Sequence, residues 1–290
     1  MLKNILDGKC IFHNSRDGSI FFAFKEKQFF PEKLIKIYDK SKKEKLLTIC
    51  RLLKEINNHG SGPLKDSVPQ ILYYTETGAY CVVFEEFIEG IAMERYSERK
   101  SFFWKKDFLK NLELVTCWLS HFHKNFVIKK ATITGDSIAY AREETRVFLQ
   151  PSFLNMPEGD IEIPLVMSHF DLRPSNIIRR KDKIVIIDWY KLKMEQLPLL
   201  DLLEFILLYF HSHYKFQKTG MLLEPGIILK YFDLMYLKKS RLSEGIKEKI
   251  KVYCDSLNLR DEERDFLILL WLHANLYQCR DTVYPFYENV

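Results

Sequence analysis

The sequence lacks the cysteine patterns that hold small secreted or metal-binding domains together. Its six cysteines stand singly along 290 residues, with no C-x-x-C pair and without the density of a disulfide framework. The chain also lacks a low-complexity tract and a long block of one charge sign, because its charged residues, 29% of the total, are spread over its whole length. We therefore expect reduced thiols and a globular chain.

Long hydrophobic runs are absent as well. The most apolar windows, 197–210 and 266–276, are shorter than the roughly 18 to 20 residues that cross a bilayer, and the first of them contains Asp201 and Glu204. The first 14 residues carry no apolar stretch of signal-peptide length. We expect core helices, no membrane span and a cytoplasmic protein.

The charge balance is mild, at a net +5. It suits a nucleotide or phosphate ligand, but no basic residues cluster as they do in nucleic-acid-binding proteins, so we expect no DNA or RNA partner. Hydrophobic residues make up 47% of the chain, enough for one large domain or two lobes. Nothing in the sequence indicates an oligomeric state.

The first part of the chain predicts a small β-rich lobe with one helix. β-forming runs alternate with turn residues, and apolar residues at helical spacing follow them before two further runs of β-formers. The expected strands are 10–13, 20–24, 33–38, 70–74 and 80–87, and the expected helix is 46–56.

Beyond Glu89 and Gly90 the pattern becomes mainly helical. A short hairpin is expected over 177–187, and the weak periodicity of 129–164 suggests a helix and a loop. The expected helices are 102–126, 199–214, 225–238, 244–257 and 261–279. The sequence thus predicts an α+β, bilobal chain, with a small β-rich N-terminal lobe over 1–88 and a larger, mainly helical lobe over 89–290.

Three oxygen-bearing side chains follow one another at short spacing: Asp171, Asn176 and Asp188. The apolar strand 184–187 leads directly to Asp188. Phosphoryl transfer needs oxygen ligands that hold Mg²⁺ against nucleotide phosphates, and a carboxylate that orients the acceptor hydroxyl and takes its proton. This set of residues supplies both.

The run H-F-D-L-R-P-S-N from His169 to Asn176, with I-D-W at 187–189, resembles the aminoglycoside phosphotransferase and choline kinase superfamily. Its signature is H-G-D-x-x-x-x-N, a strand and I-D-W. The P-x-x-D-L at 198–202 and the helix end at 119–123 are similar to that superfamily too. The resemblance is strong over 110–205 and weaker over 10–90, and it implies a protein-kinase-like fold and an ATP-dependent phosphotransferase.

Carried over to this sequence, the resemblance makes Asp171 the catalytic carboxylate and makes Asn176 and Asp188 the Mg²⁺ ligands. His169 is then structural. Asp201, on an apolar helix, is expected to be a buried acceptor of hydrogen bonds from the catalytic loop.

In the small lobe, K-L-I-K-I at 33–37 resembles the strand whose lysine pairs with the α- and β-phosphates of ATP, which puts Lys36 in that role. Lys33, three residues earlier, lies on the opposite face of the strand. The carboxylate that pairs with Lys36 is expected on the following helix, with Glu44 as first choice and Glu55 as the alternative.

The run E-E-F-I-E-G at 85–90 resembles the hinge of these enzymes, with the backbones of Glu86 and Ile88 bonding the adenine edge. Residues 14–19 take the place of the nucleotide loop but hold one glycine. Either backbone amides or the side chains of Ser15, Arg16 and Ser19 then cover the phosphates.

The substrate class leaves three hypotheses open. D-L-R-P-S-N also resembles the D-L-K-P-x-N of protein kinases, with Arg173 at the lysine position, where it would steady the transferring phosphoryl group. Against a protein substrate, Phe170 replaces the arginine of H-R-D, and the thirteen residues from Asp188 to Asp201 are too few for an activation segment. The third hypothesis is an inactive nucleotide-binding scaffold.

A small hydroxyl acceptor is favoured, with a sugar or related polyol slightly preferred. The aromatic residues of the second lobe could form a cage for an amino alcohol such as choline, but most such residues pack helices. An aminoglycoside would need an acidic pocket, for which Asp261, Glu262, Glu263 and Asp265 are available, although they also suit the N-terminal turn of a helix.

Overall fold

The computed structural model describes residues 9–15, 18–24, 30–97, 104–145, 155–213 and 225–276. The chain forms two compact units. The first unit comprises Met1–Ile91 and Ile178–Tyr190, and the second comprises Ala92–Ile177 and Lys191–Val290.

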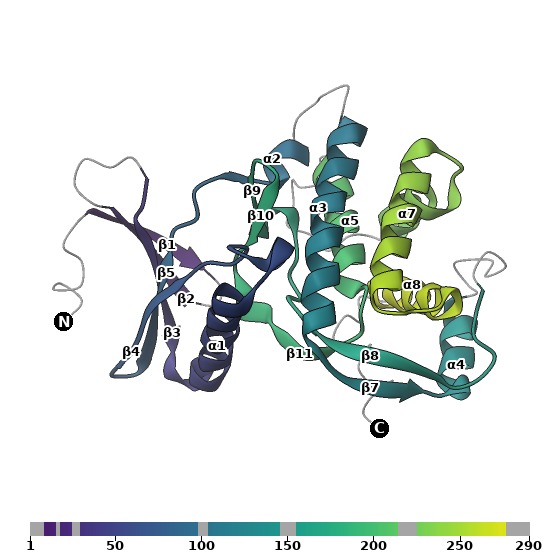
Figure 1. Ribbon diagram of the computed structural model, residues 1–290, viewed down its shortest axis with the longest axis horizontal. Helices are drawn as coiled ribbons and strands as arrows, with labels where there is room; N and C mark the ends of the chain where they lie inside the picture. The colour runs from purple at the N-terminus through teal and green to yellow at the C-terminus, as the bar shows by residue number, and fades with distance from the viewer. Residues whose placement is uncertain are drawn as a thin grey trace. The chain divides into compact units, whose positions relative to one another are not determined.

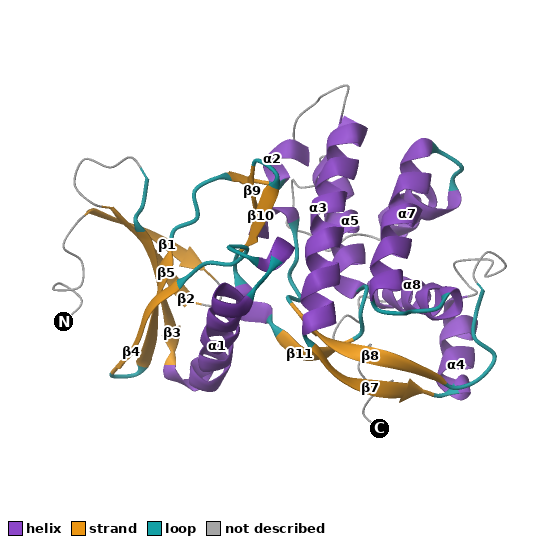
Figure 2. Ribbon diagram, viewed as in Figure 1, coloured by secondary structure: helices purple, strands orange, loops and turns teal. Residues whose placement is uncertain are grey.

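The first unit is built on a five-stranded antiparallel sheet (Figures 1 and 2). Its strand order is β1-β2-β3-β5-β4, and one helix, α1, follows β3 along the chain. The elements are β1 (Lys9–Ser15), β2 (Gly18–Phe24), β3 (Lys33–Asp39), α1 (Lys43–His59), β4 (Ile71–Thr77) and β5 (Tyr80–Glu86).

The two faces of β3 and β5 enter two separate apolar clusters, because side chains alternate along a strand. On one face, Tyr38 of β3 and Val83 of β5 pack with Leu46 and Cys50 of α1. On the other face Ile35 packs with Phe84. Helix α1 is therefore held by the face of the sheet from which Lys36 projects.

A hairpin from later in the chain completes this unit. Strand β9 (Ile177–Arg180) turns at two residues into β10 (Lys183–Ile186), and the N–H of Ile186 donates to the carbonyl of Ser67 at 2.8 Å. Gly90 passes so close to this hairpin that a Cβ at its position would lie 2.4 Å from Cγ2 of Ile178. The short strand β6 (Ile91–Ala92) pairs with β9, giving the order β10-β9-β6.

The second unit is mainly helical. The long helix α3 buries Phe108, Leu112, Trp118 and Phe122, and its neighbours supply the rest of the core. The helices are α2 (Glu94–Ser97), α3 (Trp104–Asn125), α4 (Gly135–Thr145), α5 (Leu200–His213), α6 (Pro225–Phe232), α7 (Arg241–Ser256) and α8 (Asp261–Leu276). A π-helical segment, η8 (Asp233–Leu237), joins α6 to the chain that leads to α7.

This unit also holds a three-stranded sheet of order β11-β8-β7. Its strands are β7 (Val127–Ile133), β8 (Ile161–Ser168) and β11 (Lys193–Gln196). Strands β7 and β8 are antiparallel, and β8 leads directly into the segment that carries His169 and Asp171 (Figure 1). None of the described helices is long and apolar enough to cross a membrane.

The predicted mixture of an N-terminal antiparallel sheet and later helices is confirmed. Residues 129–164 differ from the expected helix and loop, because two strands, β7 and β8, flank α4. The predicted lobe boundary after residue 88 lies close to the end of the first segment of the first unit, and that unit also takes in 178–190.

Candidate active site

The segment after β8 is held by one buried carboxylate, Asp201, in the first turn of α5. Its Oδ2 accepts hydrogen bonds from the hydroxyl of Ser168 at 2.9 Å and from the N–H of His169 at 2.8 Å. Its Oδ1 accepts the N–H of Phe170 at 3.0 Å. The hydrogen-bonding role predicted for Asp201 is thus present in the structure.

A second layer of polar groups supports this carboxylate. The phenol of Tyr253 accepts the N–H of Leu199 at 2.9 Å, so its proton is available for Nδ1 of His123. The Nε2 of His123 then lies 3.8 Å from Oδ2 of Asp201. Burial is the largest single influence on the pKa of Asp201, and it raises that pKa. His123, His169 and Ser168 act in the opposite direction and together outweigh burial, so the pKa of Asp201 lies below its ordinary value.

Phe170 adopts a left-handed backbone conformation, with φ of 59°. This region costs a residue with a Cβ about 1–2 kcal/mol, and glycine is the residue that adopts it readily. The superfamily signature has glycine at this position. The N–H of Phe170 donates to Oδ1 of Asp201 and to Oγ of Ser168, the latter at 3.1 Å, which offsets the backbone cost.

Asp171 is nearly buried, with 12% of its side chain exposed, and one of its oxygens meets two cations. Nε and Nη2 of Arg173 lie 2.9 and 2.5 Å from Oδ1, and Nζ of Lys191 lies 3.3 Å from the same oxygen. Nδ2 of Asn176 donates to the backbone carbonyl of Asp171 at 2.9 Å and lies 3.4 Å from Oδ2. The carboxylate is therefore fixed in orientation, with both hydrogen bonds from Arg173 on Oδ1.

Asn176 and Asp188 offer oxygens of the kind that Mg²⁺ takes. The hydrogen bonds of Asn176 to Asp171 use its Nδ2, so its Oδ1 can serve as a metal ligand, and Asp188 is exposed. No cluster of three His, Cys, Asp or Glu side chains suited to a metal occurs among the described residues. Each of the two residues therefore offers an oxygen of the kind that Mg²⁺ accepts.

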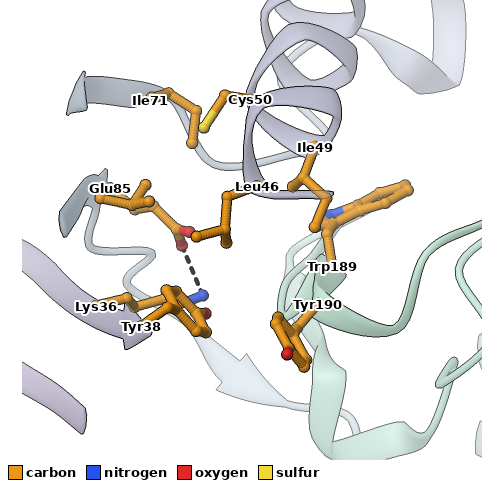
Figure 3. A pocket seen from close by; sticks show the side chains of 10 residues that line it. Lys36, Tyr38, Leu46, Ile49, Cys50, Ile71, Glu85, Trp189 and Tyr190 are labelled. Carbon is orange, nitrogen blue, oxygen red and sulfur yellow. Dashed lines mark ion pairs between the residues drawn. The ribbon is translucent and has the colours of Figure 1, made fainter. Parts of the chain in front are cut away.

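Lys36 is buried on β3, and the structure gives it a partner that differs from the prediction (Figure 3). Its Nζ lies 2.8 Å from Oε2 of Glu85 on β5, and only 8% and 9% of the two side chains are exposed. Glu44 and Glu55 on α1 are exposed. The expectation that Glu44 pairs with Lys36 is therefore wrong in this structure. The reason is register: Lys36 pairs with Val83 across the ladder, which places Glu85 two residues along on the same face.

Burial is the largest influence on the pKa of Lys36 and lowers it, but Glu85, Tyr38 and Asp188 together outweigh it, so the pKa is raised and the ammonium stays charged. Lys33, by contrast, points to the other face, where its Nζ lies 5.9 Å from the ring of Phe84. Lys36, and not Lys33, is therefore the lysine on the face that packs against α1, as the sequence assignment expected.

The turn that carries Asp188 is anchored by its two aromatic neighbours. The indole of Trp189 is buried and donates to the carbonyl of Ile186 at 2.9 Å. The ring of Tyr190 stacks on Tyr38, with centroids 5.2 Å apart and an interplanar angle of 8°. Both aromatic residues line a small pocket together with Lys36 and Glu85 (Figure 3). The first unit thus brings Asp188 into the electrostatic environment of Lys36.

The expected hinge contacts lie just after β5. The N–H of Glu86 donates to the carbonyl of Gln70 at 2.9 Å. Ile88 is buried. In the nucleotide-loop position, Ser15 ends β1 and pairs with Gly18, the first residue of β2, and Ser19 follows as the second residue of that strand. Arg16 lies outside the described residues.

Two residues of the site were not predicted. Glu85 was assigned to the hinge run, although its alternation with Val83 along β5 places it on the face of Lys36. Lys191 follows Asp188 by three residues, and its spacing gave no signal because the contact with Asp171 depends on how two loops fold.

No protein-family model matches the sequence, and no curated protein matches it either. Solved structures do match. The aminoglycoside phosphotransferase APH(3'')-Id from Streptomyces rimosus ATCC10970 is 15% identical, with a TM-score of 0.51 over 93% of this chain and 95% of that chain. The same enzyme in complex with ADP and streptomycin gives a TM-score of 0.50 at 15% identity, over 94% and 96% of the two chains. The chain therefore has the kinase-like fold of aminoglycoside phosphotransferases, as the sequence predicted.

Proposed function

We propose that this protein is an ATP-dependent phosphotransferase that transfers the γ-phosphate to a hydroxyl of a small molecule. The observation that carries this proposal is the fixed carboxylate of Asp171, set on a loop that Asp201 holds by three hydrogen bonds. Its orientation by Arg173 and Asn176 suits a group that must aim a hydroxyl. The likeness to a phosphotransferase solved with ADP and streptomycin supports the nucleotide and the class of acceptor.

In this mechanism Asp171 accepts the hydroxyl proton on Oδ2, because both hydrogen bonds from Arg173 occupy Oδ1. The hydroxyl oxygen forms a bond to Pγ as the bond from Pγ to the β-phosphate oxygen breaks, and ADP leaves. Arg173 steadies the phosphoryl group, and Lys36 holds the α- and β-phosphates. Asn176 and Asp188 would hold Mg²⁺, which neutralises phosphate charge when it is bound. The backbones of Glu86 and Ile88 would bond the adenine edge.

The test is acceptor-dependent ADP release with Mg²⁺, followed over a panel of sugars, amino alcohols, aminoglycosides and generic proteins. Asp171→Asn should lower kcat by about 10²–10⁴-fold, the range that general acid–base groups contribute. Asp233→Asn is the matched control, because Asp233 is half exposed and pairs with Lys238 at 3.6 Å on the surface of the second unit. Unchanged turnover in Asp171→Asn would refute the role of this carboxylate.

A protein Ser/Thr kinase is the second candidate, because Arg173 stands where protein kinases have their phosphate-contacting lysine and does contact the catalytic carboxylate. Phosphate incorporated into protein substrates but into no small molecule would establish it. Nucleotide binding without turnover across the whole panel would instead indicate a scaffold.

A further inference from the structure

A single buried phenol, that of Tyr253 on α7, contacts two of the groups that surround Asp201. Its oxygen accepts the N–H of Leu199 at 2.9 Å and lies 2.5 Å from Nδ1 of His123 on α3. Tyr253, His123 and Asp201 are 0%, 1% and 4% exposed. Their polar atoms therefore depend on protein groups, and not on bulk water, for hydrogen bonds.

Leu199, the first of the two partners, stands directly before the helix that carries Asp201. It adopts a left-handed backbone conformation, with φ of 74°, which a residue with a Cβ enters only at a cost. Its carbonyl accepts the N–H of Leu203 at 3.0 Å, the first helical hydrogen bond of α5. N–H groups at the start of a helix have no helical acceptor, and Tyr253 supplies one for Leu199. The phenol thus holds the backbone two residues before Asp201.

His123, the second partner, receives the phenol proton. Because the phenol oxygen already accepts the N–H of Leu199, its O–H is left to donate, and Nδ1 of His123 lies within hydrogen-bond distance. Burial is the largest influence on the pKa of Tyr253 and raises it well above its ordinary value, so the phenol keeps this proton. A neutral imidazole that accepts a hydrogen bond at Nδ1 carries its own proton on Nε2.

The other ring nitrogen of His123 lies beside the carboxylate of Asp201. Nε2 is buried, makes no hydrogen bond within the described part of the chain, and lies 3.8 Å from Oδ2 of Asp201. This separation is longer than a hydrogen bond, so the interaction is electrostatic. With the proton on Nε2, the positive end of an N–H dipole lies beside the carboxylate, whereas a proton on Nδ1 would leave a ring lone pair there and repel it.

From these contacts, and resting on the proposed phosphotransferase function, we propose that Tyr253 is a positioning residue for the transfer. Its phenol holds Asp201 from two sides, through the backbone at the start of α5 and through the tautomer of His123. Asp201 in turn accepts the N–H groups of the two residues before Asp171. Helix α7 thereby takes part in orienting the catalytic carboxylate, although it carries none of the groups assigned to ATP, Mg²⁺ or the acceptor.

Tyr253→Phe keeps the ring and removes the hydroxyl. We expect kcat to fall about 10- to 100-fold, the range that outer partners of a site contribute, with KM for ATP within about twofold, because the proposed ATP contacts lie on other elements. Tyr209→Phe is the matched control: Tyr209 is a buried tyrosine on α5, the helix of Asp201, and accepts Nδ2 of Asn111 at 2.9 Å. It should leave kcat within about twofold. Equal losses of kcat in the two variants would overturn the proposal, since they would reflect a general disturbance of packing.

The ring nitrogens of His123 test the hydrogen bond from Tyr253 directly. Long-range proton–nitrogen correlation spectra of protein labelled at histidine are recorded, and His123→Gln assigns the resonances. Wild type should carry a proton on Nε2 and none on Nδ1, and in Tyr253→Phe the Nδ1 resonance should move toward that of a ring nitrogen without a hydrogen bond. A proton on Nδ1 in wild type would overturn the proposal, and this wild-type measurement decides even if Tyr253→Phe folds poorly.

Amide hydrogen exchange separates this proposal from the phosphotransferase function, because it needs no turnover. Tyr253→Phe should speed exchange at Leu199, His169 and Phe170 by about tenfold or more, and Tyr209→Phe should change none of them by more than about twofold. If wild type released ADP with no acceptor, the phosphotransferase function would be refuted, and exchange would still decide whether Tyr253 orders this segment. Unchanged exchange at His169 and Phe170 in Tyr253→Phe would refute the link from α7 to the loop, whatever the turnover.

Discussion

Asp201→Asn tests how much of the catalytic loop depends on one buried carboxylate. Asparagine has the same shape, but its amide can replace only one of the two acceptor oxygens. The less costly orientation places Nδ2 at the Oδ1 position, where it faces one donor, the N–H of Phe170, instead of the two donors on Oδ2. That N–H then meets a donor in place of a charged acceptor and keeps its 3.1 Å bond to Oγ of Ser168, which costs about 1–2 kcal/mol. The bonds from Ser168 and His169 each lose about 0.5–1 kcal/mol because the acceptor is no longer charged. The expected loss is about 3 kcal/mol.

Urea unfolding measures this loss, and hydrogen exchange of the His169 and Phe170 amides locates it. The variant should fold with an unchanged far-UV spectrum, lose protection at these two amides and lose most of its turnover. Asp233→Asn, on the surface, should stay within about 0.5 kcal/mol of wild type. A loss below about 1 kcal/mol, with protection retained at both amides, would refute the reasoning.

The same carboxylate predicts an acid limit to stability. Its pKa lies below the ordinary value of about 3.9 in the folded state. Its contribution is therefore fully present above that value and is lost as pH falls through the lower, folded pKa. Wild type should lose stability steeply below about pH 4, and Asp201→Asn less steeply. Parallel pH profiles would show that other carboxylates dominate.

Four further substitutions probe the scaffold of the site by urea unfolding and nucleotide titration. Replacing Lys36 by Met or Glu85 by Leu leaves one buried charge unpaired and should cost about 3–5 kcal/mol of unfolding free energy. The double variant should recover most of that stability and still fail to bind ATP. Additive losses of stability in the double variant would contradict this expectation. Tyr253→Phe removes the acceptor of the Leu199 N–H and should cost about 1–3 kcal/mol, while wild-type stability would show that this N–H finds another partner. Gly90→Ala should cost at least about 1 kcal/mol because its Cβ meets the β9 hairpin, and a neutral result would mean that the hairpin shifts freely.

The first unit could be predicted strand by strand because its signals are local. Period-two alternation marks β2, β3 and β5, and the change to helical spacing marks α1. The region 129–164 resisted prediction for a physical reason. Strand β7 is mostly exposed, with Ala131 and Ile133 as its buried positions, so it shows little of the apolar alternation that identifies a half-buried strand.

The residues of the candidate site also differ in how well the sequence alone predicts them. Asp171, Asn176 and Asp188 follow from a compact motif, and Asp201 follows from one acid on an otherwise apolar helix. Lys191 and Glu85 belong to the site through loop conformation and strand register, which a single sequence specifies only weakly. Spacing therefore indicates the oxygen-bearing groups of the candidate site, and structure is needed to find the charged groups that pair with Asp171 and Lys36.

The pairing of Lys36 with Glu85 bears on how a nucleotide would bind. A carboxylate on α1 could leave Lys36 whenever that helix shifts, but Glu85 is fixed on β5, the strand hydrogen-bonded to the strand of Lys36, and the pair moves as one piece of the sheet. The partner of the ammonium is consequently independent of α1, and Glu85, Tyr38 and Asp188 together keep the pKa of Lys36 raised. Phosphate oxygens would then join Glu85 at Lys36 instead of replacing it, and their negative charge would be balanced by Mg²⁺ on the exposed side chain of Asp188. It follows that ATP affinity in this protein should depend on Mg²⁺ more strongly than on any movement of the helix.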